Sequence, residues 1–74
     1  MSRTLSSREV VTILLREGFV FISQRGSHAK YRKMVGGKTV TVIILAGKHE
    51  IPTGTLRSII RQSQLEKDYF FKED

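Results

Sequence analysis

His28 is the residue whose type and surroundings best suit chemistry. It follows Gly26 and Ser27, which read as part of a glycine-containing loop. Lys30 and Arg32 come two and four residues further along an alternating segment. Alternate residues of a strand share a face, so the histidine and both cations are expected to point the same way. Imidazole exchanges protons near neutral pH, which makes this a pattern compatible with acid or base catalysis beside positive charge.

Cleavage of RNA without a metal needs such a combination. The ribose 2′-hydroxyl attacks the adjacent phosphorus, which requires a base, cations for the developing charge and an acid for the leaving oxygen. His28 is a candidate for one proton transfer, and Lys30 and Arg32 for charge stabilisation. Gly26 would let a phosphate approach the backbone, and N–H groups of a Gly26-Ser27 turn can bind an anion. A histidine near basic residues is more often an ordinary surface residue, so both interpretations stay open.

Other constellations are weaker. His49 lies in the polar stretch 48–50, where a solvated loop histidine is the simpler interpretation. The carboxylates form no pair suited to glycoside hydrolysis, two histidines form no recognisable metal site, and Ser27 lacks the surroundings of a nucleophile elbow. The chain has no cysteine, which excludes disulfides, zinc-thiolate sites and cysteine nucleophiles. No metal or cofactor is predicted.

Length and composition indicate a single small domain over residues 1–74. Hydrophobic residues make up 39% of the chain, which is enough for a packed core. The formal net charge of +6 favours a polyanionic partner, most often nucleic acid. The longest apolar stretch, 40–46, is too short for a membrane span, and no signal-peptide pattern opens the chain. We therefore expect a cytoplasmic protein with no membrane association.

Two helices flank the central part of the sequence. Ser6 and Glu9 have capping-box spacing, so a helix is expected from about Ser7 to Glu17, ended by Gly18. A second helix opens at residues 52–55. One side of this helix is expected to face inward, and its residues are Leu56, Ile59, Ile60 and Ser63. Arg57 and Arg61 face outward, one helical turn apart, and are candidate contacts to an RNA backbone.

Three strands are expected between the helices. Residues 19–22 predict the first strand, with 24–27 as a connecting loop. Residues 28–34 predict the second strand, a hairpin follows at Gly36-Gly37, and Lys38–Leu45 predicts the third. A polar loop, 46–51, leads to the second helix, and a final turn at 66–71 is expected to place an aromatic residue on the core. The result is an α+β fold, α-β-β-β-α, with a three-stranded antiparallel sheet and two helices on one face, as in double-stranded-RNA-binding domains.

Two separated motifs resemble the HicA toxins of bacterial and archaeal toxin–antitoxin pairs. The first combines Gly18-Phe19 with Gly26-Ser27-His28 and Tyr31, and the second is Gly54-Thr55-Leu56-Arg57-Ser58-Ile59-Ile60-Arg61-Gln62. The resemblance extends over about residues 7–70. It implies a translation-blocking mRNA endoribonuclease with one essential histidine, which maps onto His28. It also implies a HicB antitoxin that covers the active-site face.

One position departs from the family pattern. Members commonly carry Val-Pro-x-His at the end of the third strand, whereas this chain reads Val42-Ile43-Ile44-Leu45. A role for that second histidine therefore does not carry over. His49 would replace it only if its loop folded back towards the site, so the proton-transfer partner of His28 stays unassigned.

The leading prediction is a metal-independent mRNA endoribonuclease with His28 as general acid or base. The runner-up is a non-catalytic RNA-binding module of the same fold, motivated by the missing histidine. A third hypothesis is an interaction protein whose basic face docks an acidic partner. A helix-turn-helix interpretation, with Arg57 and Arg61 in a DNA groove, fits the sequence poorly, because an ordinary helix-turn-helix has no three-strand segment before that helix.

Overall fold

The computed structural model describes residues 4–71. Residues 1–3 and 72–74, the two ends of the predicted domain, lie outside the described residues. The elements follow the predicted order; they are α1 (Ser7–Arg16), β1 (Val20–Arg25), β2 (His28–Val35), β3 (Lys38–Leu45), α2 (Thr53–Ser63) and a short 3-10 helix, η1 (Lys67–Tyr69).

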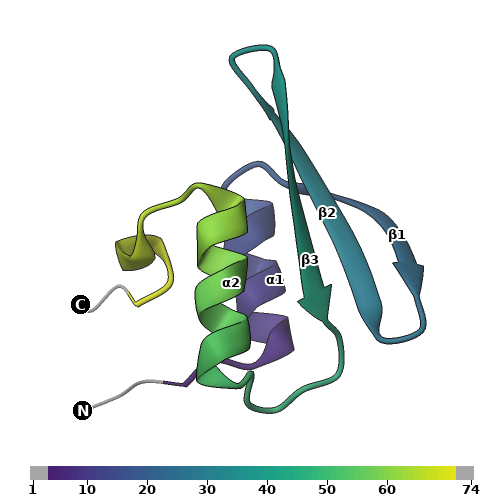
Figure 1. Ribbon diagram of the computed structural model, residues 1–74, viewed down its shortest axis with the longest axis vertical. Coiled ribbons are helices and arrows are strands. Elements are labelled where there is room, and N and C mark those ends of the chain that lie inside the picture. The colour runs from purple at the N-terminus through teal and green to yellow at the C-terminus, as the bar shows by residue number, and fades with distance from the viewer. Residues whose placement is uncertain (1–3, 72–74) are drawn as a thin grey trace.

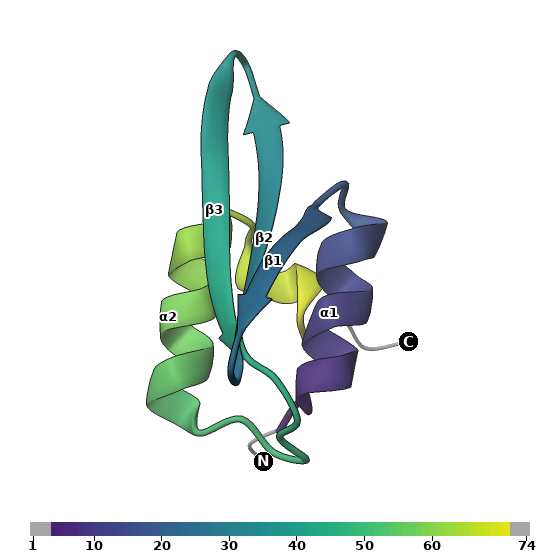
Figure 2. The same ribbon diagram turned by 90° about the vertical axis from the view of Figure 1, so that its right-hand side faces the viewer.

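The three strands form one antiparallel sheet in the order β1-β2-β3. Both helices lie against the same face of this sheet (Figure 1), and the strands stand in front of them when the molecule is turned by 90° (Figure 2). We call the face that the helices leave uncovered the outer face. The predicted α+β architecture is confirmed.

The first helix forms as its capping residues predict. The Ser6 hydroxyl accepts a hydrogen bond from the Glu9 backbone N–H at 3.1 Å, and the Glu9 carboxylate accepts one from the Ser6 N–H at 2.8 Å. These reciprocal bonds satisfy backbone donors that the first helical turn leaves unpaired. The chain leaves the helix through Gly18 at φ +95°, a conformation that side chains disfavour. Helix α1 ends at Arg16, with Glu17 as its cap.

Strand β1 is longer than predicted, and its start is later. It runs from Val20 to Arg25, so two positions assigned to a loop are strand residues. The reason is a two-residue turn, Gly26-Ser27, which lets Arg25 pair directly with His28. Gly26 has φ +60° and is the first central residue, as in the type II′ turns that suit twisted hairpins. A bulge lies between Phe21 and Ser23.

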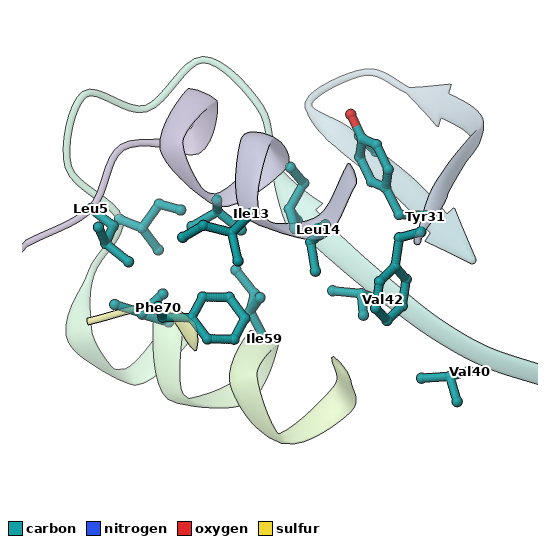
Figure 3. Packing of buried hydrophobic residues seen from close by; sticks show 14 residues of the cluster. Leu5, Ile13, Leu14, Tyr31, Val40, Val42, Ile59 and Phe70 are labelled. Carbon is teal, nitrogen blue, oxygen red and sulfur yellow. The ribbon is translucent and has the colours of Figure 1, made fainter. Parts of the chain in front are cut away.

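The core lies between the helices and the inner sides of β2 and β3. Tyr31 and Val42 from the sheet are buried in one cluster with Leu14 of α1 and Ile59 of α2 (Figure 3). The Phe70 side chain, which is 2% exposed, packs onto this cluster from the C-terminal segment. The prediction that the final turn places an aromatic residue on the core is confirmed. Each such side chain contributes about 1.5–3 kcal/mol by leaving water. The core therefore fixes which face of β2 is buried.

Candidate functional site

The outer face carries His28 at the end of the sheet next to the Gly26-Ser27 turn. The register places Arg25 of β1 on one side of His28 and Leu45 of β3 on the other. Directly opposed residues of neighbouring strands have Cβ atoms about 4.5–5.5 Å apart. His28 itself is exposed. His28 therefore lies between an arginine and a leucine on the neighbouring strands and is open to solvent.

Lys30 and Arg32 continue the same row along β2. Lys30 pairs with Ser23 and Ile43, and both cations are half-buried. Long basic side chains at half-buried positions cover apolar surface with their aliphatic stems. The Nε of Arg32 is buried and has no hydrogen-bond partner among the described residues. The Arg32 guanidinium therefore keeps an unpaired N–H on the strand that carries His28.

Within residues 4–71, the strands contribute no carboxylate to the outer face. Cross-strand pairing assigns to it, within the described residues, Val20, Ser23, Arg25, His28, Lys30, Arg32, Met34, Thr39, Thr41, Ile43 and Leu45. The sequence has no Asp or Glu between Glu17 and Glu50. Unopposed cations on one surface attract polyanions. This acid-free stretch was readable in the sequence, but our site prediction did not use it and so missed Arg25.

The Gly26-Ser27 turn is held from both sides. The Gln24 side-chain amide donates to the Gly26 carbonyl at 3.0 Å, and the Ala46 N–H donates to the Ser27 carbonyl at 2.7 Å. The second bond ties the turn to the loop that follows β3. Among residues 4–71, no heavy atom beyond Gly26 and its two chain neighbours lies within 4 Å of the position that a Gly26 Cβ would take. The turn therefore fixes the start of β2 and leaves open space beside Gly26.

Arg57 and Arg61 do not join the outer face. Both are exposed on α2, which lies behind the sheet (Figure 2). The side of α2 that meets β3 carries Gln62, whose side-chain oxygen accepts the Ile43 N–H at 3.0 Å. The structure thus separates the two arginines from His28. Their assignment as RNA backbone contacts stays a prediction.

The loop after β3 folds back onto the start of α1. The Ser7 N–H donates to the Lys48 carbonyl at 2.9 Å, and the Lys48 N–H donates to the Ser7 hydroxyl at 2.9 Å. That hydroxyl also donates to the Leu45 carbonyl. These bonds explain why Ser7 is buried despite its polarity. The loop that carries His49 is therefore built into the fold.

His49 lines a pocket of about 620 Å³ on the helix-covered side of the sheet, which we call the rear pocket. Its walls come from the start of α1, from β1 and β2 near the turn, and from the loop after β3. Tyr31 lines it, and burial raises the pKa of the Tyr31 phenol. His28 is absent from the lining, so the two histidines do not share this pocket. Sequence reasoning identified neither the pocket nor its residues Arg8 and Lys48.

Two further properties concern residues 4–71. They contain no group of three or more His, Asp or Glu side chains that could hold a metal ion. None of their helices is both long enough and apolar enough to cross a membrane.

Comparison with protein families decides the class of the molecule. The family model described as the HicA toxin of bacterial toxin–antitoxin systems matches residues 7–65. The chain belongs to the HicA toxin family. The match runs from the first residue of α1 to just beyond α2, so it includes His28 and the Gly54–Gln62 motif. HicA toxins pair with HicB antitoxins. Comparison with curated proteins gives no match.

Proposed function

We propose that this HicA toxin is a metal-independent endoribonuclease that cleaves mRNA in the cytoplasm and thereby blocks translation. His28 is the general acid or base. Lys30 and Arg32 stabilise charge on the reacting phosphate, and Gly26 and Ser27 shape the approach to His28. Arg57 and Arg61 are assigned to more distant RNA backbone contacts.

One observation carries this proposal: His28 is exposed on an open sheet face, in a row with cations, and the strands described within residues 4–71 add no carboxylate to that face. A neighbouring carboxylate would repel phosphate and offset the cations. The open face also suits a polymer, because an RNA strand can lie across it without entering a closed cavity.

The reaction that fits is internal transesterification. The ribose 2′-oxygen forms a bond to phosphorus, the bond from phosphorus to the 5′-oxygen breaks, and a 2′,3′-cyclic phosphate and a 5′-hydroxyl result. His28 either takes the 2′-hydroxyl proton or gives a proton to the 5′-oxygen, and water serves the other transfer. Lys30 and Arg32 lie on the same face, where they oppose the additional negative charge of the phosphorane.

The HicB antitoxin is assigned to the outer face. Apolar side chains alternate there with the cations: Val20 is 55% exposed and Met34 63%. A partner with both acidic and apolar groups would cover such a surface well and would remove His28 from solvent.

The test is RNA cleavage by the purified chain in EDTA, with His28→Ala beside wild type. Arg16→Ala is the control, because Arg16 is exposed on α1 away from the outer face. We expect His28→Ala to lower the rate by roughly 100-fold or more, the usual range for an acid–base group. Equal cleavage by His28→Ala and wild type would overturn the role of His28, and loss of all cleavage in EDTA would overturn metal independence.

A second candidate is a non-catalytic RNA-binding module. The observation that favours it is Leu45, which lies directly across from His28 where the family commonly has its second histidine. This candidate predicts RNA binding that weakens steeply with salt, because phosphate contacts release counterions. RNA that binds in this way but stays intact after long incubation with excess wild-type protein would favour it over the nuclease.

A further inference from the structure

The rear pocket is not used by the chemistry assigned to His28. It nevertheless lies at the same end of the sheet, because Gln24 and Ala29, which flank the Gly26-Ser27 turn, form part of its wall. His28 and the pocket are therefore on opposite sides of one tight turn. An RNA strand held at His28 has to pass this two-residue turn to reach the pocket.

The rim of the rear pocket is cationic. Arg8 and Lys48 line it together with His49, and no Asp or Glu of residues 4–71 is among the lining residues. The nearest carboxylate in sequence to Arg8 is Glu9, and its side chain is engaged with the Ser6 backbone N–H at 2.8 Å. The pocket therefore favours an anionic ligand.

The floor of the rear pocket is apolar and aromatic. Ala29, Tyr31 and Ile44 contribute to it, and the Tyr31 ring is held edge-on by Phe21 with centroids 5.7 Å apart. The Tyr31 hydroxyl points away from the packed aliphatic side chains (Figure 3). The Gln24 amide also lines the pocket, and its donation to the Gly26 carbonyl fixes its orientation. Nucleic-acid bases combine a flat apolar face with polar edges, which suits a floor of this kind.

The rear pocket is held in shape by hydrogen bonds. Lys48 is fixed through both its backbone N–H and its carbonyl to Ser7, each at 2.9 Å. Ala46 is fixed to the turn beside His28 through the Ser27 carbonyl at 2.7 Å. A ligand therefore does not have to order this loop, which lowers the entropic cost of binding.

We propose that the rear pocket is a nucleotide subsite of this toxin, which binds one nucleotide of the RNA strand adjacent to the nucleotide held at His28. The base lies on the floor beside Tyr31, and a phosphate lies between Arg8 and Lys48. The subsite rests on the proposed RNA cleavage and extends it, because it sets how the strand bends around the Gly26-Ser27 turn.

The experiment compares Arg8→Ala/Lys48→Ala with Arg16→Ala, a variant of the same helix whose residue is outside the rear pocket. The first readout is the Kd for a short 2′-O-methyl oligoribonucleotide, which lacks the attacking hydroxyl and stays intact. We expect the double variant to raise this Kd about 10-fold and Arg16→Ala to change it less than about 2-fold, since only the former removes phosphate contacts. In cleavage assays KM should rise by the same factor with kcat unchanged.

A second readout uses the wild-type protein and needs no variant. Titration with adenosine or uridine 5′-monophosphate should shift the NMR signals of the Tyr31 and His49 rings. Shifts confined to the outer face, or a double variant that matches Arg16→Ala, would overturn the subsite. Loss of antitoxin binding with RNA binding intact would also overturn it and assign the pocket to the protein partner.

The two proposals fail in different ways. Wild-type protein that binds the 2′-O-methyl strand through Arg8 and Lys48 but never cleaves RNA would retain the subsite and reject the nuclease. Cleavage that depends on His28 and is insensitive to both rim substitutions would retain the nuclease and reject the subsite.

Discussion

The two faces of strand β2 have opposite properties, although their residues alternate along one segment. Ala29 and Tyr31 point to the helices and are 2% and 7% exposed, and they belong to the core. His28, Lys30 and Arg32 point to the outer face, where no helix covers them. Because the strand period is two, a single strand can serve folding on one face and ligand binding on the other. Substitutions on the two faces should therefore affect different measurable quantities.

The largest expected effect is on stability, and β3 offers a matched pair of isoleucines. Ile44 faces the core at 1% exposure, whereas its neighbour Ile43 faces outward at 36%. Ile44→Ala should lower the free energy of unfolding by about 3 kcal/mol, because it removes buried methylenes and leaves a cavity. Ile43→Ala should lower it by about 1 kcal/mol or less. Urea unfolding measures both.

Losses of similar size at Ile43 and Ile44 would contradict the division between the faces. Such a result would mean that the outer face is covered in solution, for example by a second chain. Repeating the measurement at several protein concentrations separates these cases, because only an assembled form has concentration-dependent stability.

The second effect is on catalysis, and β2 offers a matched pair of lysines. Lys30→Ala should lower RNA cleavage roughly 100-fold, the usual loss when one stabilising charge is removed from a reacting phosphate, with stability unchanged. Lys33 faces the helices, and its Nζ lies over the Phe19 ring, 5.7 Å from the ring centroid. Lys33→Ala should lower the free energy of unfolding by about 0.5–1 kcal/mol and leave the cleavage rate nearly unchanged. If both variants lost activity equally, general positive charge rather than the outer face would explain the function.

Local patterns in the sequence were sufficient for the architecture. The capping residues Ser6 and Glu9, the alternation from His28 onward and the paired glycines at 36 and 37 each act within a few residues, so the sequence alone predicted the helix and strands they define. The same alternation placed Lys30 and Arg32 on the face of His28. The end of β1 was predicted too early, because the polar residues Gln24 and Arg25 resemble a loop until their partners in β2 are known.

The rear pocket could not be predicted from the sequence, because it depends on contacts between distant segments. Ser7 contacts Leu45 and Lys48 through hydrogen bonds that span 38 and 41 residues. Nothing in the local pattern around Arg8 indicates that it lies near Lys48. The neighbour of His28 across β3 likewise depends on register, which identifies Leu45 as the residue beside the imidazole.

A third, smaller effect, on the cleavage rate, tests the pairing of Leu45 with His28. Leu45→His would introduce a second imidazole directly across from His28, where it can serve the other proton transfer. We expect the cleavage rate to rise roughly 10-fold and the pH–rate profile to acquire a second titration. Ile43→His is the control, since it lies on the same strand and face but opposite Lys30. A rise of equal size in both variants would show that position 45 has no special relation to His28.

The smallest effect concerns Tyr31, the core residue that also reaches the rear pocket. Burial raises the pKa of its phenol above the ordinary value near 10. Above about pH 10 the unfolded chain loses this proton before the folded chain does, so it binds fewer protons and the free energy of unfolding falls as pH rises. The contribution of Tyr31 is complete below about pH 10 and is lost as pH increases through the raised pKa. Tyr31→Phe should flatten this alkaline decline. Urea unfolding at about pH 8 and about pH 10.5 measures the difference, and a decline that Tyr31→Phe does not alter would assign it to another group.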